Sequence, residues 1–146
     1  MPPKADPQRD NVYWLEAEFN GWWHHVRSPR DKLLDYVTAV CKYYGVEEPK
    51  VVISRRKEVN CDGDYLHSVI TLYVGRGDNP GVLMHELAHH VIDELYEDVE
   101  AHGPEFCAVY MHLLDKWCFL PNEEFRRLAK KYKLRIGRRY RPRAFK

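Results

Sequence analysis

The six residues HELAHH, at positions 85 to 90, restrict the fold of this 146-residue chain more than any other stretch. Residues four apart in an α-helix lie on one face about one turn from each other, so His85 and His89 can direct two imidazoles at one metal ion. Glu86 is rotated by about 100° from His85, which lets its carboxylate reach a water on that metal without being a ligand. The pattern favours a helix with a catalytic metal site over a solvated helix face whose histidines and glutamate occur by chance.

Cap and turn residues predict the elements around this helix. Four helices are expected, each opened by a proline and followed by apolar periodicity, over residues 29–44, 80–95, 104–117 and 121–136. The expected N-caps of the first three are Ser28, Asp78 or Asn79, and Gly103. Residues 50–59 and 65–74 are rich in β-branched and aromatic residues and flank the turn signal NCDGD, which predicts a β-hairpin. The chain is therefore expected to fold as one small α+β domain with a hairpin packed on helices.

Composition and the N-terminal sequence indicate the expected location of the protein and the redox state of its cysteines. The four cysteines form no C-x-x-C pair, which argues against a zinc ribbon and a thioredoxin-like motif and indicates reduced thiols. The polar first ten residues do not resemble a signal peptide, and no apolar run approaches the roughly 18 residues of a membrane span. A cytoplasmic monomer without membrane contact is expected. The first ten residues and the chain after Gly137 are the expected disordered ends.

A catalytic zinc takes three protein ligands and leaves a position for water, so two histidines are not enough. The third ligand could be His102, which follows a connecting loop at the start of the next helix, or one of the acidic residues nearby, Glu97, Glu100 and Glu105. His90 is rotated off the ligand face and is expected to be solvated or hydrogen-bonded. No Lys or Arg occurs between Asp78 and Asp115, and such an acidic neighbourhood favours a divalent cation.

These residues resemble a known family. HELAHH, an acidic connector and then HGPEFCAVYMH are similar to the HExxH and HGxxF pattern of the SprT/Spartan zinc metalloproteases, over roughly residues 80–114. The resemblance implies a zincin-like minimal metalloprotease domain, Zn²⁺ bound by His85, His89 and His102, and Glu86 as the catalytic acid and base. It also implies intracellular cleavage of protein substrates, including proteins crosslinked to DNA. Many bacterial members end in a cysteine zinc ribbon, whereas this chain has a basic tail over residues 138–146 after a domain over 1–137.

The basic C-terminal segment is the predicted nucleic-acid contact. Residues 126–146 contain 11 Lys or Arg and no Asp or Glu, although the whole chain carries a net charge of only +1. Tyr132, Tyr140 and Phe145 are interleaved and could stack on unpaired bases. The candidate binding residues are Arg138, Arg139, Arg141 and Arg143. The alternative for this segment is a solvated helix face followed by a solubilising tail.

Other readings remain open at this point. The competing class is a nucleic-acid-binding module with a structural zinc, although such sites usually include cysteines and Cys107 is rotated by about 140° from His102. Tyr96, Tyr110 and Tyr140 are candidates to stabilise an oxyanion, with Tyr110 also a candidate for the core. The cluster of Trp22, Trp23, His24 and His25 is expected to pack against the core, or else to contact substrate or nucleic acid.

Overall fold

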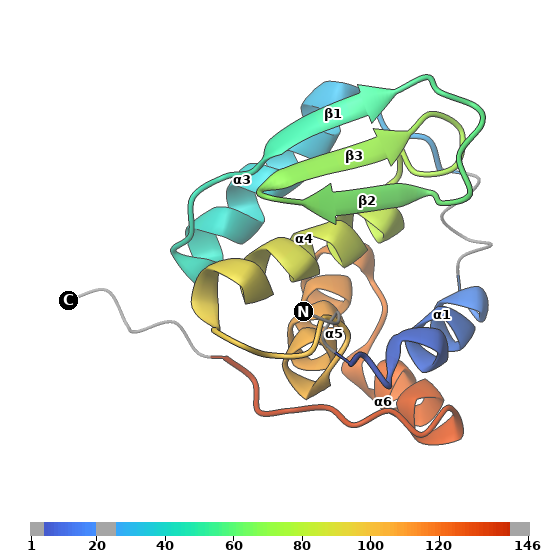
Figure 1. The fold of residues 1–146 in the computed structure, drawn as a ribbon, viewed down its shortest axis with the longest axis vertical. Coiled ribbons are helices and arrows are strands. Elements are labelled where there is room, and N and C mark those ends of the chain that lie inside the picture. The colour runs from blue at the N-terminus through green and yellow to red at the C-terminus, as the bar shows by residue number, and fades with distance from the viewer. Residues whose placement is uncertain (1–4, 20–25, 141–146) are drawn as a thin grey trace.

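The computed structural model describes residues 5–19 and 26–140, and the cluster at 22–25 lies outside these ranges. The described part is a small α+β fold with five helices and one three-stranded sheet (Figure 1). In chain order the elements are α1 (Arg9–Ala17), α3 (Arg30–Tyr44), β1 (Lys50–Ser54), β2 (Gly63–Leu66), β3 (Val69–Tyr73), α4 (Pro80–Leu95), α5 (Pro104–Cys118) and α6 (Asn122–Lys131). The α+β class expected from the sequence is confirmed.

The sheet differs from the predicted hairpin. Its strand order is β1-β3-β2, with β1 parallel to β3 and β2 antiparallel to β3. The prediction of one strand over 65–74 is wrong, because His67 (φ 48°) and Ser68 (φ 62°) form a two-residue turn that folds β2 back onto β3. Positive φ at both turn residues matches the twist of a tight hairpin. The hairpin is therefore β2–β3, and β2 is left as an edge strand.

The sheet lies on a layer of helices. In Figure 1 it forms the upper part of the molecule, with α3 behind it and α4 directly beneath it. Ile70 and Leu72 of the central strand β3 are fully buried, and their neighbours Val69, Thr71 and Tyr73 are half-buried. This alternation is expected of a sheet whose one face packs on helices.

Helix α4 is the centre of the domain. It begins and ends at the predicted residues, and the Asn79 side chain accepts a hydrogen bond from the backbone N–H of Val82 at 3.0 Å. Most residues of α4 up to Ile92 are buried, and the helix contacts α3, α5 and the sheet. Helix α5 runs beside α4 and carries the fully buried Phe106 and Tyr110. The histidine-bearing helix is therefore a rigid part of the core.

Two predicted helix ends need correction. Helix α3 begins at Arg30, with Pro29 as its N-cap, and the Ser28 side chain makes no cap hydrogen bond. The backbone N–H of Ser28 instead donates to the carbonyl of Asp78, which places Ser28 before the helix. Helix α6 ends at Lys131 rather than near residue 136, because Lys133 adopts a left-handed φ of 56°.

Both ends of the described chain contact the domain, contrary to the expectation of disorder. The buried Gln8 side chain donates to the carbonyl of His102 at 3.0 Å and accepts from the backbone N–H of Arg135 at 2.6 Å. Near the other end, Tyr140 packs against the ring of Tyr44, and Arg139 donates to the hydroxyl of Tyr43. The signal for disorder was polarity alone, and these polar groups are satisfied by the folded domain.

Across the described residues, none of the helices has the length and apolar character that a membrane crossing requires.

Candidate metal centre

Three histidine side chains converge between α4 and the start of α5. His85 and His89 come from successive turns of α4, and His102 lies two residues before α5. One ring nitrogen from each lies within 4.8 Å of the other two, and no other described residue joins this group. His85 and His102 are buried, and His89 is half-buried. The structure thus brings together the three histidines that the sequence named, as a group that can hold a metal ion.

Two carboxylates orient two of these rings. Glu16 of α1 accepts a hydrogen bond from Nδ1 of His85 at 3.0 Å and a second from the hydroxyl of Tyr110 at 3.0 Å. Asp6 accepts from Nδ1 of His102 at 2.7 Å and from the backbone N–H of the same residue at 2.9 Å. A proton held on Nδ1 leaves Nε2 of each ring with a free lone pair. This carboxylate–histidine pairing is typical of metal ligands.

His89 is held by aromatic rings instead. The ring of Phe106 lies 4.6 Å from the His89 ring, centroid to centroid, and the ring of Tyr65 stacks on it at 6.4 Å. Burial, together with the neighbouring His85 and His102, lowers the pKa of His89 well below its usual value. His89 is therefore neutral and can offer a lone pair.

Two further observations indicate that the three histidines fit a metal ion. The buried Nε2 atom of His102 has no hydrogen-bond partner, which is costly for a polar atom unless it binds something. The Nε2 atoms of His85 and His89 are 3.2 Å apart, close to the roughly 3.3 Å between two ligands of a tetrahedral zinc with Zn–N bonds of about 2.05 Å. Burial opposes protonation of His85, but the carboxylates of Glu16 and Glu86 raise its pKa to about 9. A metal ion would take the place of that proton.

Glu86 lies beside the three histidines on α4. Its side chain is buried, its Oε2 atom has no hydrogen-bond partner, and its Oε1 atom is 3.9 Å from Nε2 of His85. Burial raises the pKa of Glu86 to about 7; the neighbouring His85 opposes this rise, and the carboxylate of Glu16 adds to it. A carboxyl group with a pKa near neutrality can both accept and return a proton.

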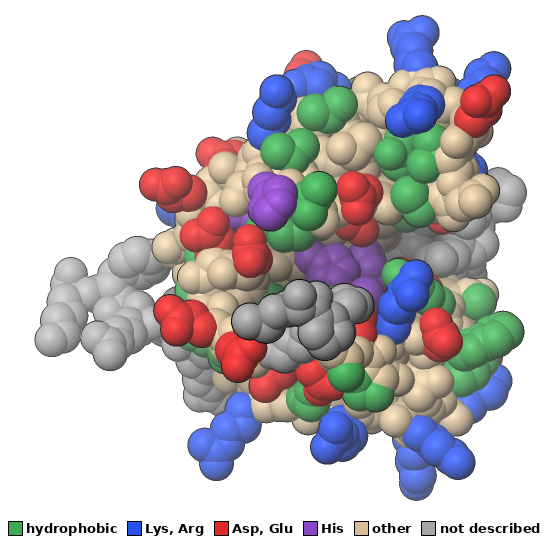
Figure 2. Space-filling view, in the orientation of Figure 1, with side chains coloured by type: hydrophobic (Ala, Val, Ile, Leu, Met, Phe, Trp, Pro, Cys, Tyr) green, Lys and Arg blue, Asp and Glu red, His purple; other side chains and the backbone are tan. Residues whose placement is uncertain are grey.

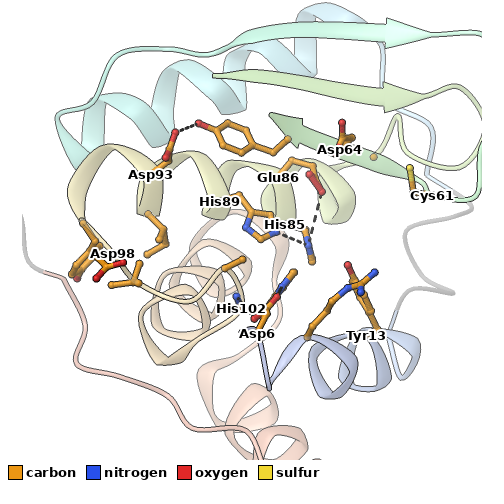
Figure 3. Close-up of a pocket in the computed structure, with 17 residues that line it drawn as sticks. Asp6, Tyr13, Cys61, Asp64, His85, Glu86, His89, Asp93, Asp98 and His102 are labelled. Carbon is orange, nitrogen blue, oxygen red and sulfur yellow. Dashed lines mark hydrogen bonds and ion pairs between the residues drawn. The ribbon is translucent and has the colours of Figure 1, made fainter. Parts of the chain in front are cut away.

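The centre opens into a cleft of about 600 Å³ between the sheet and α1. Figure 2 shows histidine side chains in this hollow, with acidic side chains gathered to one side of it. The edge strand β2 forms the upper wall, and Asp6, Tyr13, Asp64, Asp93 and Asp98 are among the lining residues (Figure 3). Gly63 lets β2 approach α4, because a Cβ atom there would lie only 2.8 Å from Cγ1 of Val82.

The other ligand candidates and the basic residues named from the sequence do not join the three histidines. His90 is buried and hydrogen-bonded to Tyr65 and to the carbonyl of Glu47. The other acidic ligand candidates do not belong to the group: Glu97, Glu100 and Glu105. Of the basic candidates, Arg138 and Arg139 are exposed at the end of the described chain, and Arg141 and Arg143 lie beyond it.

The sequence reasoning missed Asp6, Tyr13 and Glu16. A signal existed for Glu16, since it shares the buried helical stripe of Val12, Leu15 and Phe19, where a carboxylate needs a partner. No periodic signal marks Asp6, because it precedes the helix in a polar segment.

Neither protein-family models, nor curated proteins, nor solved structures give a match to this chain.

Proposed function

We propose that this chain is a zinc-dependent metallopeptidase of zincin-like fold that hydrolyses peptide bonds in protein substrates. The observation that carries the proposal is the convergence of His85, His89 and His102 beside the buried carboxyl group of Glu86, whose Oε2 atom has no hydrogen-bond partner. Three imidazoles suit zinc, and a site with three protein ligands leaves a position for a reacting group. The resemblance of HELAHH and HGPEF to the SprT/Spartan motifs points to the same chemistry.

Zinc, Glu86 and the two carboxylates that orient the histidines have different roles in the proposed reaction. Zinc bound here would act as a Lewis acid that polarises a peptide carbonyl and lowers the pKa of a water molecule. Glu86 takes the proton from the attacking water and returns it to the nitrogen of the leaving amine. Glu16 and Asp6 keep the rings of His85 and His102 in the tautomer with a free Nε2 atom.

The edge strand β2 offers a place for the substrate. Gly63, Asp64 and Tyr65 line the cleft above Glu86, and within residues 5–19 and 26–140 β2 pairs on one side alone, with β3. An extended peptide can add to such an edge through backbone hydrogen bonds. β3 is the interior strand of the sheet, so β2 is the strand that borders the cleft.

The competing class, a nucleic-acid-binding module with a structural zinc, receives less support. Structural zinc sites close with four protein ligands, usually including cysteine. In the part of the chain that the structure describes, the group holds three histidines and no cysteine, and the nearest thiol to His102, Cys107, donates to its carbonyl rather than lying among the rings.

Association with DNA is a separate part of the proposal. It rests on the charge of residues 126–146, of which Arg138 and Arg139 are exposed at the end of the described chain. The charge would attract the phosphate backbone and bring the peptidase to proteins held on DNA.

Replacement of Glu86 by Gln tests the catalytic proposal. The variant should keep one zinc per chain and lose hydrolysis of casein and of a quenched fluorescent peptide library, because only proton transfer is removed. The matched control is Glu94→Gln, an exposed glutamate on the same helix, which should keep both properties. A wild-type protein that binds zinc and cleaves none of these substrates, or a Glu86→Gln variant as active as wild type, would overturn the proposal.

A further inference from the structure

One tyrosine of α1 stands next to the metal centre. The ring of Tyr13 stacks on His85 with the two ring centroids 6.2 Å apart, and its edge faces His102 at 5.5 Å. The residue lies one turn before Glu16, so both project from the same side of α1 towards the histidines. In Figure 3 the Tyr13 side chain rises from α1 into the cleft with its hydroxyl towards the side on which Glu86 lies.

The other tyrosines near the site have their hydroxyls engaged or placed elsewhere. Tyr110 donates its proton to the buried Glu16, and Tyr65 donates to Asp93 at 2.8 Å. Tyr140 packs against Tyr44 at the end of the described chain and is not among the residues that line the cleft. Tyr96 lines the cleft and contacts Tyr140, but it has no ring contact with the three histidines.

The surroundings of Tyr13 favour donation of its proton into the cleft. Its side chain is 44% exposed, so a bound peptide can reach it. The guanidinium of Arg9 lies 5.6 Å from the Tyr13 ring centroid. Arg9 has no acceptor atom, so the phenol proton of Tyr13 cannot go to this neighbour and remains available to an acceptor in the cleft.

We propose that Tyr13 is a catalytic residue that donates a hydrogen bond to the scissile carbonyl oxygen as that oxygen gains negative charge. This inference rests on the proposed peptidase function. The phenol proton stays on the Tyr13 oxygen throughout, while Glu86 carries the proton of the attacking water. Tyr13 therefore faces the reacting carbonyl from the α1 wall of the cleft, opposite the β2 edge on which the peptide backbone would lie. Removal of one such donor lowers kcat by about 100- to 1,000-fold in other enzymes.

Tyr13→Phe removes this hydroxyl and keeps the ring that contacts His85 and His102. The variant should bind one zinc per chain with wild-type affinity, and its kcat should fall by about 100-fold with KM changed by less than about threefold. The matched control is Tyr36→Phe, which removes a tyrosine hydroxyl on α3 outside the cleft lining and should leave kcat within about twofold of wild type.

Binding of a peptide phosphinate, a mimic of the tetrahedral anion, gives a readout that needs no turnover. Calorimetry should show at least about tenfold weaker binding to zinc-loaded Tyr13→Phe than to wild type, and no change for Tyr36→Phe. Unchanged kcat and phosphinate affinity in Tyr13→Phe, with an active wild type, would overturn the role of Tyr13 alone. Loss of zinc from Tyr13→Phe would also overturn it, because the residue would then be structural. A wild type that binds zinc without cleaving any substrate would instead remove the proposed function, and the role of Tyr13 with it.

Discussion

Replacement of Asp6 by Ala should weaken zinc binding although Asp6 is not itself a ligand. Its carboxylate accepts two hydrogen bonds from His102, one from Nδ1 at 2.7 Å and one from the backbone N–H at 2.9 Å. The Asp6 side chain is 19% exposed and that of His102 is 7% exposed, so water replaces the lost partner poorly. A hydrogen bond to a charged group contributes about 1.5–3 kcal/mol. That range corresponds to a roughly 10- to 100-fold loss of zinc affinity, as is usual for the outer partner of a histidine ligand.

Competition with a chromophoric chelator measures this loss, with Asp10→Ala as the matched control. Asp10 is an exposed aspartate four residues further on, so its removal changes the charge of the same segment without touching His102. In a His102→Ala background, Asp6→Ala should lower zinc affinity almost no further, because the imidazole that it orients is already absent. Equal zinc affinities for Asp6→Ala and wild type, or equal losses in both aspartate variants, would refute the argument that Asp6 acts by orienting His102.

Three further changes test other parts of the structure. Gly63→Ala places a Cβ atom 2.8 Å from Cγ1 of Val82 and should lower the free energy of unfolding in urea by about 1–3 kcal/mol; an unchanged midpoint would contradict the close approach of β2 to α4. His112, whose Nδ1 accepts from the Tyr44 hydroxyl at 2.6 Å, has a pKa lowered to about 4 by burial and then by nearby cations. The unfolded chain protonates His112 at a higher pH than the folded chain does. The stabilisation that comes from keeping His112 neutral is therefore complete above about pH 6.5 and is lost as the pH falls towards 4. His112→Asn should flatten that part of the profile of stability against pH, and a variant with the wild-type slope would contradict this. A further variant replaces four C-terminal cations by Gln: Arg138, Arg141, Arg143 and Lys146. The slope of log affinity for DNA against log salt should fall by up to roughly 0.7–0.9 per contact, and the zinc content should stay intact. An unchanged slope would rule out the role of this segment in DNA binding. Substitution is preferable to truncation after residue 137, because Tyr140 packs on the domain.

The helices that carry the histidines could be predicted closely because local chemistry determines their ends. Asn79 and Pro80 open α4, Gly103 and Pro104 open α5, and the structure has both helices starting at these prolines. Local signals were weaker for α6, where the stop at Lys133 depends on a left-handed backbone at a residue that rarely adopts it. Apolar periodicity had continued past that point to Ile136.

Strand pairing could not be predicted in the same way. The turn at His67 and Ser68 has positive φ at both residues but contains neither Asn nor Gly, the usual residues of such a turn. The more obvious turn signal, NCDGD at 60–64, instead belongs to the connection between β1 and β2 and to the start of β2. Parallel pairing of β1 with β3 depends on contacts between distant segments, which local patterns do not record.

The site residues were likewise predictable where the signal is local in the sequence, and not where it depends on distant segments. His85, His89 and Glu86 follow from helical spacing, and His102 from its position at the next helix start. Asp6 and Glu16 reach the histidines over 96 and 69 positions in the sequence, so their roles appear only when the N-terminal segment is folded onto α4 and α5. This segment supplies the partners of two of the three rings, which motif reasoning on residues 80–114 could not supply.

The most direct test of the central claim is a crystal structure of the purified protein with anomalous data collected on both sides of the zinc absorption edge. One zinc per chain is predicted, bound by Nε2 of His85, His89 and His102 at about 2.0–2.1 Å, with Glu86 outside its ligands. A structure with no metal at this group after zinc is supplied, or with zinc held by a cysteine or by one of Glu97, Glu100 and Glu105 in place of a histidine, would contradict the account.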